Sequence, residues 1–450
     1  FAKELCELNN QSESDLEILD LEGFYNIYVN PLYTGNDSNG TLLKPYISIS
    51  DAVTNSTLTN NKIFIQGDNI ITSEIILPRS LSFFGLDGTK IRYQTFDVSN
   101  ENIFKFIGTD NTLEFLFKNI EFSNAGDYAL NITNSTRLDV IDCSFYTNGW
   151  NGTNLNTVVS STISNVYGYD STNVNLDNFF NSADISSNSG AVLLENINTL
   201  QIVGNKFIKN NGSIRIIDCG IGSTVFITRN VSSQNVGVGI SLESGTLLGC
   251  QNITTLMNYS SFNANNGLSV VGGINNKFSQ NEVNGNWNAG FYASGAVNTT
   301  LRDSGLYDNN RSLFTGIGTD SNSKATIHLN EESDLIKNQL QTNTLSKFIV
   351  EILDTQIHNT GLGSNTSKIG IYISVNIGSL PDSDKNIIKI DDVGFIGQYY
   401  AVDLTEVNIT NIRLSLGDNS YQNIGLYAVT TPLGGMYSEL PFSNHIMEVP

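Results

Sequence analysis

The stretch Ile202-Val203-Gly204-Asn205-Lys206-Phe207-Ile208-Lys209-Asn210-Asn211, which leads to Gly212, decides the fold because similar stretches recur along the chain. Two of them are Ile227-Thr228-Arg229-Asn230-Val231-Ser232-Ser233-Gln234-Asn235, before Gly237, and Leu256-Met257-Asn258-Tyr259-Ser260-Ser261-Phe262-Asn263, before Gly267. Each contains a short apolar strand, an Asn or Asp, a Phe-like residue, an Asn-rich turn and a Gly that opens a second apolar strand. A strand–turn–strand unit that repeats in this way indicates a repeat architecture.

The repeat is marked by Asn119, Asp142, Asn205, Asn230 and Asn258, which are separated by 23, 63, 25 and 28 residues. A period near 25 residues is too short for a strand–helix–strand unit and suits one coil of a solenoid. Coils that stack about 4.8 Å apart would form parallel sheets around an interior of Ile, Val, Leu and Phe. Some 410 residues then predict about 16 coils, or fewer if loops are long.

Asparagine is the most unusual feature of the composition, with 61 Asn against 15 Lys. If an Asn occupies the same corner in successive coils, the side-chain amides can hydrogen-bond to one another along the axis. They can also pair the buried backbone N–H and C=O groups of the turn. We therefore expect Asn230 and Asn258 to point inward in such a ladder.

The chain divides by pattern into an acidic lead-in or cap at residues 1–23 and a β-solenoid over residues 24–450. Residues 45–53 predict a short helix that Ser48 or Ser50 could cap. The segments 312–345 and 355–368 indicate loops that project from the stack, and no linker divides the solenoid.

The charge excludes several classes of function. The net charge is −21 and only 15% of residues are charged, which disfavours nucleic acid and anionic membranes as partners. No stretch approaches 18 uninterrupted apolar residues, so we expect no membrane-spanning segment. With no CxxC pair and three scattered His, we expect no metal and no cofactor.

The four cysteines, Cys6, Cys143, Cys219 and Cys250, could be buried thiols or could form one or two disulfides. Cys219 and Cys250 lie 31 residues apart, which is one coil plus a small insertion, and equivalent Cα atoms about 4.8 Å apart suit a disulfide. The low Lys content and the start at Phe1 favour a secreted chain in an oxidising compartment.

The chain has 15 Asn-x-Ser/Thr sequons, and its composition alone would give roughly 12 by chance, so the number permits glycosylation without showing it. The candidates in predicted loops are Asn36, Asn39, Asn151, Asn310 and Asn365.

Two patterns carry a family resemblance. The segment from Ile27-Tyr28-Val29-Asn30-Pro31 through Gly35-Asn36-Asp37-Ser38-Asn39-Gly40-Thr41 to Ala52-Val53 is similar to a start common in right-handed parallel β-helix proteins. The coil pattern Asn-x-Phe-x-x-Asn…Gly-Ile-x-Leu resembles the pectin-lyase-like superfamily. The resemblance implies an all-β, single-stranded right-handed parallel β-helix with projecting loops. Its members include polysaccharide lyases and hydrolases, phage and virus spikes, surface adhesins and structural glycoproteins, so the fold alone does not fix the activity.

Catalytic motifs of that superfamily are mostly missing. Of the polygalacturonase-like set only Asp391-Asp392 is matched, and two turn aspartates facing solvent explain it more simply. Lys206 and Arg229, 23 residues apart, could lie side by side as a sugar-acid site, although charge pairing on a solvated face is the commoner arrangement. Trp150 and Trp287 lie in Asn/Gly-rich turns and are candidate sugar contacts.

The sequence therefore favours a secreted, non-catalytic β-helix protein of a cell-surface coat, appendage, filament or adhesive structure, glycosylated if the host allows. Its expected partners are further copies of itself, other surface proteins or glycans, at the cell surface or on a virion. The alternatives are a polysaccharide lyase or hydrolase, including a tailspike depolymerase, and a carbohydrate-binding module.

Overall fold

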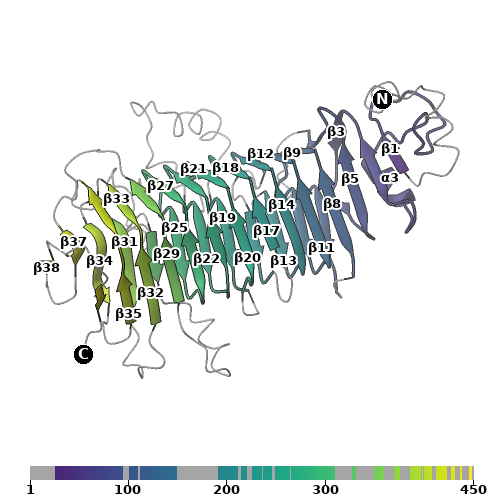
Figure 1. Cartoon of the computed structure of the whole chain (residues 1–450). Coiled ribbons are helices and arrows are strands. Elements are labelled where there is room, and N and C mark those ends of the chain that lie inside the picture. Colours follow the sequence, from purple (N-terminus) through teal and green to yellow (C-terminus); the bar gives the residue numbers. More distant parts are fainter. Residues whose placement is uncertain are drawn as a thin grey trace, which may run out of the picture.

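The protein forms a long stack of β-strands in the computed structural model (Figure 1). The structure describes residues 26–94, 101–109, 112–148, 191–210, 214–219, 225–235, 237–245, 249–263, 265–309, 327–330, 349–358, 369–375, 386–396, 398, 400–407, 412–422, 427–430, 436–437 and 445–447. The acidic lead-in lies outside these residues, so the division at residue 23 stays a prediction.

Three sheets run along the stack, and each is built from strands contributed by successive coils. Sheet A contains β1 (Asn26–Val29), β2 (Lys62–Ile65), β5 (Leu81–Gly85), β8 (Glu114–Lys118), β11 (Arg137–Ile141), β14 (Thr199–Val203), β17 (Val225–Thr228), β20 (Ile253–Leu256), β23 (Lys277–Ser279), β26 (Thr299–Arg302), β29 (Ile349–Leu353), β32 (Asn386–Asp391), β35 (Ile412–Leu416) and β39 (His445–Met447). Sheet B contains β3 (Asp68–Ile71), β6 (Lys90–Tyr93), β9 (Glu121–Ser123), β12 (Ser144–Tyr146), β15 (Lys206–Ile208), β18 (Val231–Ser233), β21 (Tyr259–Ser261), β24 (Glu282–Asn284), β27 (Gly305–Tyr307), β30 (Gln356–His358), β33 (Gly394–Ile396) and β36 (Ser420–Gln422). Sheet C contains β4 (Ile75–Ile76), β7 (Phe104–Ile107), β10 (Leu130–Thr133), β13 (Val192–Glu195), β16 (Ile214–Ile217), β19 (Ile240–Glu243), β22 (Leu268–Val271), β25 (Phe291–Ser294), β28 (Ile327–Asn330), β31 (Ile369–Val375), β34 (Tyr400–Val407), β37 (Tyr427–Thr430) and β38 (Met436–Tyr437).

Each coil visits the sheets in the order A, B, C. The chain passes from β14 to β15 through the two-residue corner Gly204-Asn205, crosses to β16, and returns to sheet A at β17. Neighbouring strands pair in parallel except β35 with β39 and β37 with β38, which are antiparallel at the C-terminal end. The fold is the predicted single-stranded right-handed parallel β-helix.

The described residues form fewer coils than the chain length and the repeat period predicted. Sheet A has 14 described strands, and leaving out the antiparallel β39 gives 14 − 1 = 13 parallel coils, against about 16 predicted. Thirteen coils have 12 gaps, so this described stack is about 58 Å long at about 4.8 Å per gap. In sheet A, β11 pairs directly with β14 and β26 pairs directly with β29, although the chain segments between these strands are long.

Aromatic rings stack through the interior from one coil to the next. Phe122, Phe145 and Phe207 occupy the same inward position of sheet B, with ring centroids 5.1 Å and 4.7 Å apart. Phe83 and Phe117 stack in the same way beneath sheet A at 5.1 Å. These rings are fully buried, so each coil contributes apolar area that it could not shield alone.

Two asparagine ladders hold the corners, as predicted for Asn230 and Asn258. Between sheets A and B, the side-chain oxygen of Asn258 accepts from the backbone and side-chain nitrogens of Asn230 at 3.0 Å and 2.9 Å. This first ladder contains Asn205, Asn230, Asn258 and Asn281; after sheet B, the second contains Asn148, Asn210, Asn235, Asn263, Asn286 and Asn309. Asn230 and Asn258 are 1% and 2% exposed, so the inward orientation is confirmed.

Asn119 and Asp142, taken as members of the same repeat position, do not belong to the first ladder. They lie one residue earlier, in a column of left-handed residues that includes Arg229 and Met257, with φ between 52° and 56°. Asn and Asp tolerate this conformation better than most residues, which explains why they appear there. The ladder position of the Asp142 coil is Cys143, whose backbone nitrogen donates to Asn205.

The N-terminal coil carries the predicted short helix, α3 (Ile49–Asn55). Ser48 caps it by accepting from the backbone nitrogen of Asp51 at 3.1 Å, and Ile49, Ala52 and Val53 are buried. The antiparallel strands β38 and β39 cover strand edges at the other end, where parallel edges would otherwise remain open to pairing.

Candidate functional site

The predicted sugar contacts and glycosylation sites are only partly described. Trp287 is half-buried in the turn between β24 and β25, and its backbone nitrogen donates to the carbonyl of Asn263 at 2.8 Å. Asn36 and Asn39 are exposed in the loop after β1. Trp150, Asn151, Asn310 and Asn365 lie outside the described residues, so these assignments stay predictions.

The predicted disulfide between Cys219 and Cys250 is wrong, because the structure holds both residues as free, buried thiols. The spacing argument was correct: the two residues stack on adjacent coils, where the backbone nitrogen of Gln251 donates to the carbonyl of Cys219 at 2.9 Å. Each thiol instead approaches a carbonyl of the preceding coil, Leu194 for Cys219 and Ile216 for Cys250, at 3.7 Å and 3.3 Å. Burial raises the pKa of Cys250 to about 12, so it is a poor nucleophile in the folded protein.

Lys206 and Arg229, the alternative considered for a sugar-acid site, are not register partners. In the parallel register Lys206 lies beside Val231, while Arg229 occupies the left-handed corner that follows β17. Asp391 lies 3.1 Å from Lys389, and the adjacent Asp392 is exposed at a left-handed corner. Asp392 is therefore a corner residue of the kind that a turn favours, while Asp391 ends β32.

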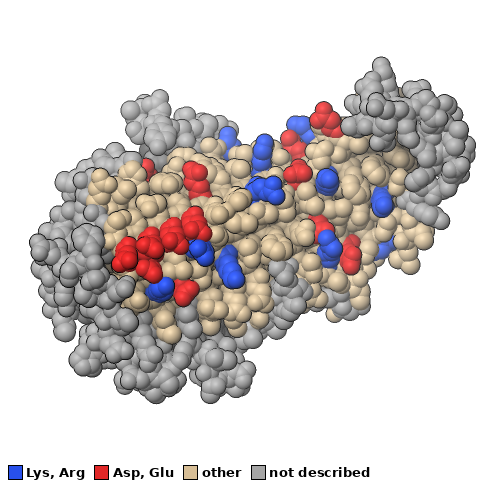
Figure 2. Space-filling model, in the orientation of Figure 1, with Lys and Arg blue, Asp and Glu red and all other residues tan. Residues whose placement is uncertain are grey.

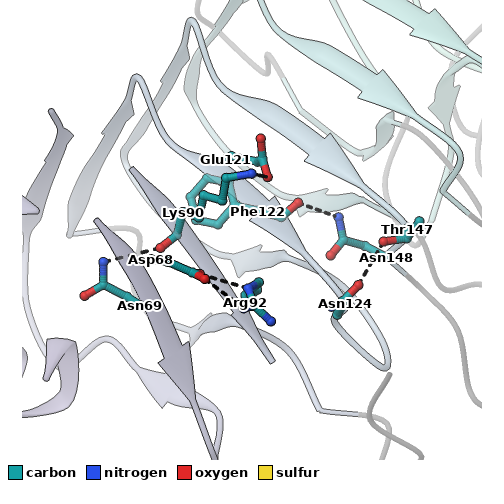
Figure 3. Close-up of polar contacts among 9 residues, drawn as sticks. All are labelled: Asp68, Asn69, Lys90, Arg92, Glu121, Phe122, Asn124, Thr147 and Asn148. Carbon is teal, nitrogen blue, oxygen red and sulfur yellow. Dashed lines mark hydrogen bonds and ion pairs between the residues drawn. The ribbon is translucent and has the colours of Figure 1, made fainter. Parts of the chain in front are cut away.

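Charge pairs link successive coils at the N-terminal end of sheet B. The guanidinium of Arg92 donates twice to Asp68, at 2.8 Å and 2.7 Å, and Lys90 lies 2.9 Å from Glu121 on the next coil (Figure 3). The same view shows Asn148 of the second ladder donating to the carbonyl of Phe122. Such pairs on a partly solvated face contribute little to stability and leave few charges for a ligand.

Acidic side chains gather toward the C-terminal coils on one face (Figure 2). In that part of the chain the left-handed corner column contains Asp303, Asp354 and Asp392. Arg302 binds Asp303 at 2.9 Å and Asp354 at 3.3 Å, so part of this charge is neutralised internally. Within the described ranges, no three His, Cys, Asp or Glu side chains are placed to share a metal ion.

The outer face of sheet C carries the strongest candidate site. We call it the sheet C ion cluster: Glu74, Lys105, Asp127, Tyr128, Arg215 and Glu243. Lys105 lies 3.3 Å from Glu74, which also accepts from the backbone and side-chain nitrogens of Asn102. Further along the sheet, two nitrogens of Arg215 bind one oxygen of Glu243 at 2.9 Å and 2.8 Å. The other oxygen of Glu243 accepts from the hydroxyl of Ser241 at 2.8 Å.

The pKa values of three members of this cluster, Asp127, Tyr128 and Arg215, are shifted. Burial raises the pKa of Asp127 to about 6, with Lys105 acting against the shift and Glu74 adding to it. Burial raises the pKa of Tyr128 to about 12, although Arg215 opposes the change. Burial alone would lower the pKa of Arg215, but the hydrogen bond and charge of Glu243 outweigh it and raise the pKa. Clustered groups with shifted pKa values are typical of functional sites as well as of structural ion pairs.

The sequence contained a signal for this cluster that the motif search did not use. In the parallel register, Arg215 of β16 faces Ser241 of β19, and Glu243 lies two residues further on the same outward face. Applying the coil register to the outward positions of Ile214-Arg215-Ile216-Ile217 and Ile240-Ser241-Leu242-Glu243 would have brought these residues together. Searching for motifs known from enzymes could not find them, because their proximity comes from stacking rather than from sequence spacing.

In the described part of the chain, no helix has the length and apolar character needed to cross a bilayer.

No protein-family model matches the chain, and no curated protein sequence matches it either. Solved structures do resemble it. The surface adhesin PfbA of Streptococcus pneumoniae is 10% identical, with 89% of this chain and 93% of that chain covered and a TM-score of 0.48.

Two further structures show the same general likeness. The A-module of a mannuronan C-5 epimerase from Azotobacter vinelandii is 10% identical over 83% of this chain and 94% of that chain, with a TM-score of 0.41. Tailspike protein 3 of bacteriophage CBA120 is 11% identical over 91% of this chain and 62% of that chain, with a TM-score of 0.35. The three parallel sheets and the laddered corners give this chain the right-handed parallel β-helix fold that the resemblance predicted.

Proposed function

We propose that the chain is a secreted, non-catalytic β-helix protein of a cell-surface or virion-surface structure, and that the outer face of sheet C contacts glycans. The observation that carries this proposal is the internal pairing of the cations on that face. Lys105 and Arg215 are the only Lys or Arg residues in the described strands of sheet C. Each is bound by a carboxylate of the fold.

Paired cations are poorly suited to the chemistry of acidic polysaccharides. A lyase needs a base and a cation that neutralises the uronate, and a lysine or arginine held by its own carboxylate is available for neither. The other partly exposed side chains of sheet C include an amide and a hydroxyl, Asn131 and Thr133. These groups can form hydrogen bonds with the hydroxyls of a neutral glycan, but they do not supply the base and the free cation needed to cleave an acidic polysaccharide.

A panel of acidic and neutral polysaccharides tests this proposal. The full chain is incubated with each polymer, products are analysed by mass, and binding is measured on the same immobilised polymers. We expect binding to at least one neutral glycan without release of products. Product formation on any polymer would contradict the non-catalytic assignment, and lack of binding to every glycan would contradict the proposed contact.

One observation favours a second candidate, a hydrolase of neutral glycans. A carboxyl with a pKa of about 6, as at Asp127, is suited to general acid catalysis near neutral pH. Glycoside hydrolysis requires a second carboxylate at a fixed separation, and Glu74 is the acid whose charge reaches Asp127. Turnover that is lost in both Asp127→Asn and Glu74→Gln, with folding retained, would establish this candidate in place of the first.

A further inference from the structure

The acidic and basic side chains on the outer face of sheet C are unequal in number. Among its described, partly exposed charged residues, Glu195 and Glu243 stand against Lys105 and Arg215, and Glu74 and Asp127 add two more acids at the N-terminal end of the sheet. A polyanion approaching this face would meet net negative charge unless a cation were exposed to it.

Arg215 is the cation best placed to meet such a ligand, and Glu243 occupies it. The Arg215 and Glu243 side chains retain 29% and 25% exposure, so both reach solvent at the surface of the sheet. Two of the three guanidinium nitrogens are directed at one Glu243 oxygen, and Ser241 fixes the other oxygen. Glu243 is therefore held in place from two sides, and a ligand carboxylate would have to displace it to bind Arg215.

The neighbouring groups reinforce this effect. Tyr128, which lies near Arg215, is buried and places no negative charge there at physiological pH. Leu193, beside Arg215 in the strand register, is partly exposed and offers an apolar surface rather than a charge. A neutral sugar can use this apolar contact without breaking the ion pair, whereas a uronate cannot gain the charge-assisted hydrogen bonds that would favour it.

We infer that Glu243 is a specificity-determining residue, which masks Arg215 and so restricts the outer face of sheet C to neutral glycans. This inference rests on the proposed function, because it assumes that the face meets glycans. The masking itself can be tested separately, since removing the Glu243 charge should create a binding property that the wild-type chain lacks.

The experiment compares the full wild-type chain with Glu243→Gln on immobilised polygalacturonate and on a neutral glucan. Glu195→Gln is the matched control, because Glu195 lies in the same outward column of sheet C, two coils away, and its loss changes the net charge equally. We expect Glu243→Gln to raise affinity for polygalacturonate about tenfold or more, which corresponds to about 1.4 kcal/mol. This gain should fall as salt is raised. Glu195→Gln should change either affinity less than about threefold, as expected for a charge that is not hydrogen-bonded to Arg215.

A double variant, Arg215→Gln with Glu243→Gln, should lose the gained binding, which assigns it to the uncovered guanidinium. Melting curves identify a variant that fails to fold, and Glu243→Ala then replaces Glu243→Gln. Equal gains in Glu243→Gln and Glu195→Gln, or tight polygalacturonate binding by the wild type, would overturn the inference. A wild type that binds neither polymer would contradict the proposed function. Even then, a gain of polygalacturonate affinity in Glu243→Gln would support the masking of Arg215, and no gain would contradict it.

Discussion

Removing one rung of the second asparagine ladder should destabilise the β-helix locally and strongly. Asn263 is 1% exposed and lies in the middle of this ladder. Its side-chain oxygen accepts from the backbone and side-chain nitrogens of Asn235 at 3.1 Å and 2.9 Å. Its side-chain nitrogen donates to the Asn286 side chain at 2.9 Å and to the carbonyl of Ser232 at 3.2 Å.

The magnitude follows from the groups that Asn263→Ala leaves unpaired. The backbone N–H of Asn235 would remain buried without its acceptor, which costs about 1–3 kcal/mol. Loss of the other amide contacts adds about 1 kcal/mol, so we expect a decrease of about 3 kcal/mol in the free energy of unfolding. Because each coil contacts only its neighbours, the effect should be concentrated between β18 and β24.

Urea unfolding and hydrogen exchange measure this effect together. At about 1.4 kcal/mol per factor of ten, exchange of the Asn235 amide should accelerate about 100-fold. Asn36→Ala, in the exposed loop after β1, is the control and should change stability by less than about 0.5 kcal/mol. Equal stabilities for the two variants would refute the claim that buried amide ladders hold the coils together.

Three other predictions concern ionisation, thiols and glycans. Folding raises the pKa of Asp127 from 3.8 to about 6, so the folded state binds the proton more tightly and stability should fall as the pH rises through this interval. Solvent screening reduces the effect to about 1 kcal/mol at this partly buried site, and urea titrations at pH 4 and pH 7 should show it in the wild type but not in Asp127→Asn. Cys143, Cys219 and Cys250 should resist a thiol reagent in the folded protein and react after denaturation without reductant; a non-reducing peptide map with a Cys219–Cys250 link would contradict this. After secretion from a eukaryotic host, mass spectrometry should find glycans at Asn36 or Asn39, and sugar on Asn230 or Asn258 would be incompatible with their buried ladder positions.

The regular part of the fold could be predicted because its physical cause is local. Apolar strands, Asn-rich corners and Gly recur at one coil length in residues 202–267, and the structure confirms the strands and the ladder there. The same reasoning misplaced Asn119 and Asp142 by one residue. An Asn suits both a left-handed corner and a ladder position, and its sequence context does not distinguish them.

The candidate site was less accessible to sequence reasoning. The pairing of Arg215 with Glu243 depends on the register between β16 and β19, which loop lengths determine. The disulfide failed for a related reason: stacking put Cys219 and Cys250 on adjacent coils, but side-chain rotation directed their thiols to different carbonyls. Spacing along a solenoid predicts which residues lie on adjacent coils. The hydrogen bonds available to each side chain then determine whether two such neighbours bind each other.

Immunogold electron microscopy of the source cells or particles, with antibodies raised against the folded chain, tests the proposed surface role most directly. The account predicts label on the outermost surface, removed by mild proteolysis of intact material. Label confined to the interior, with no signal at the surface before or after permeabilisation, would contradict it.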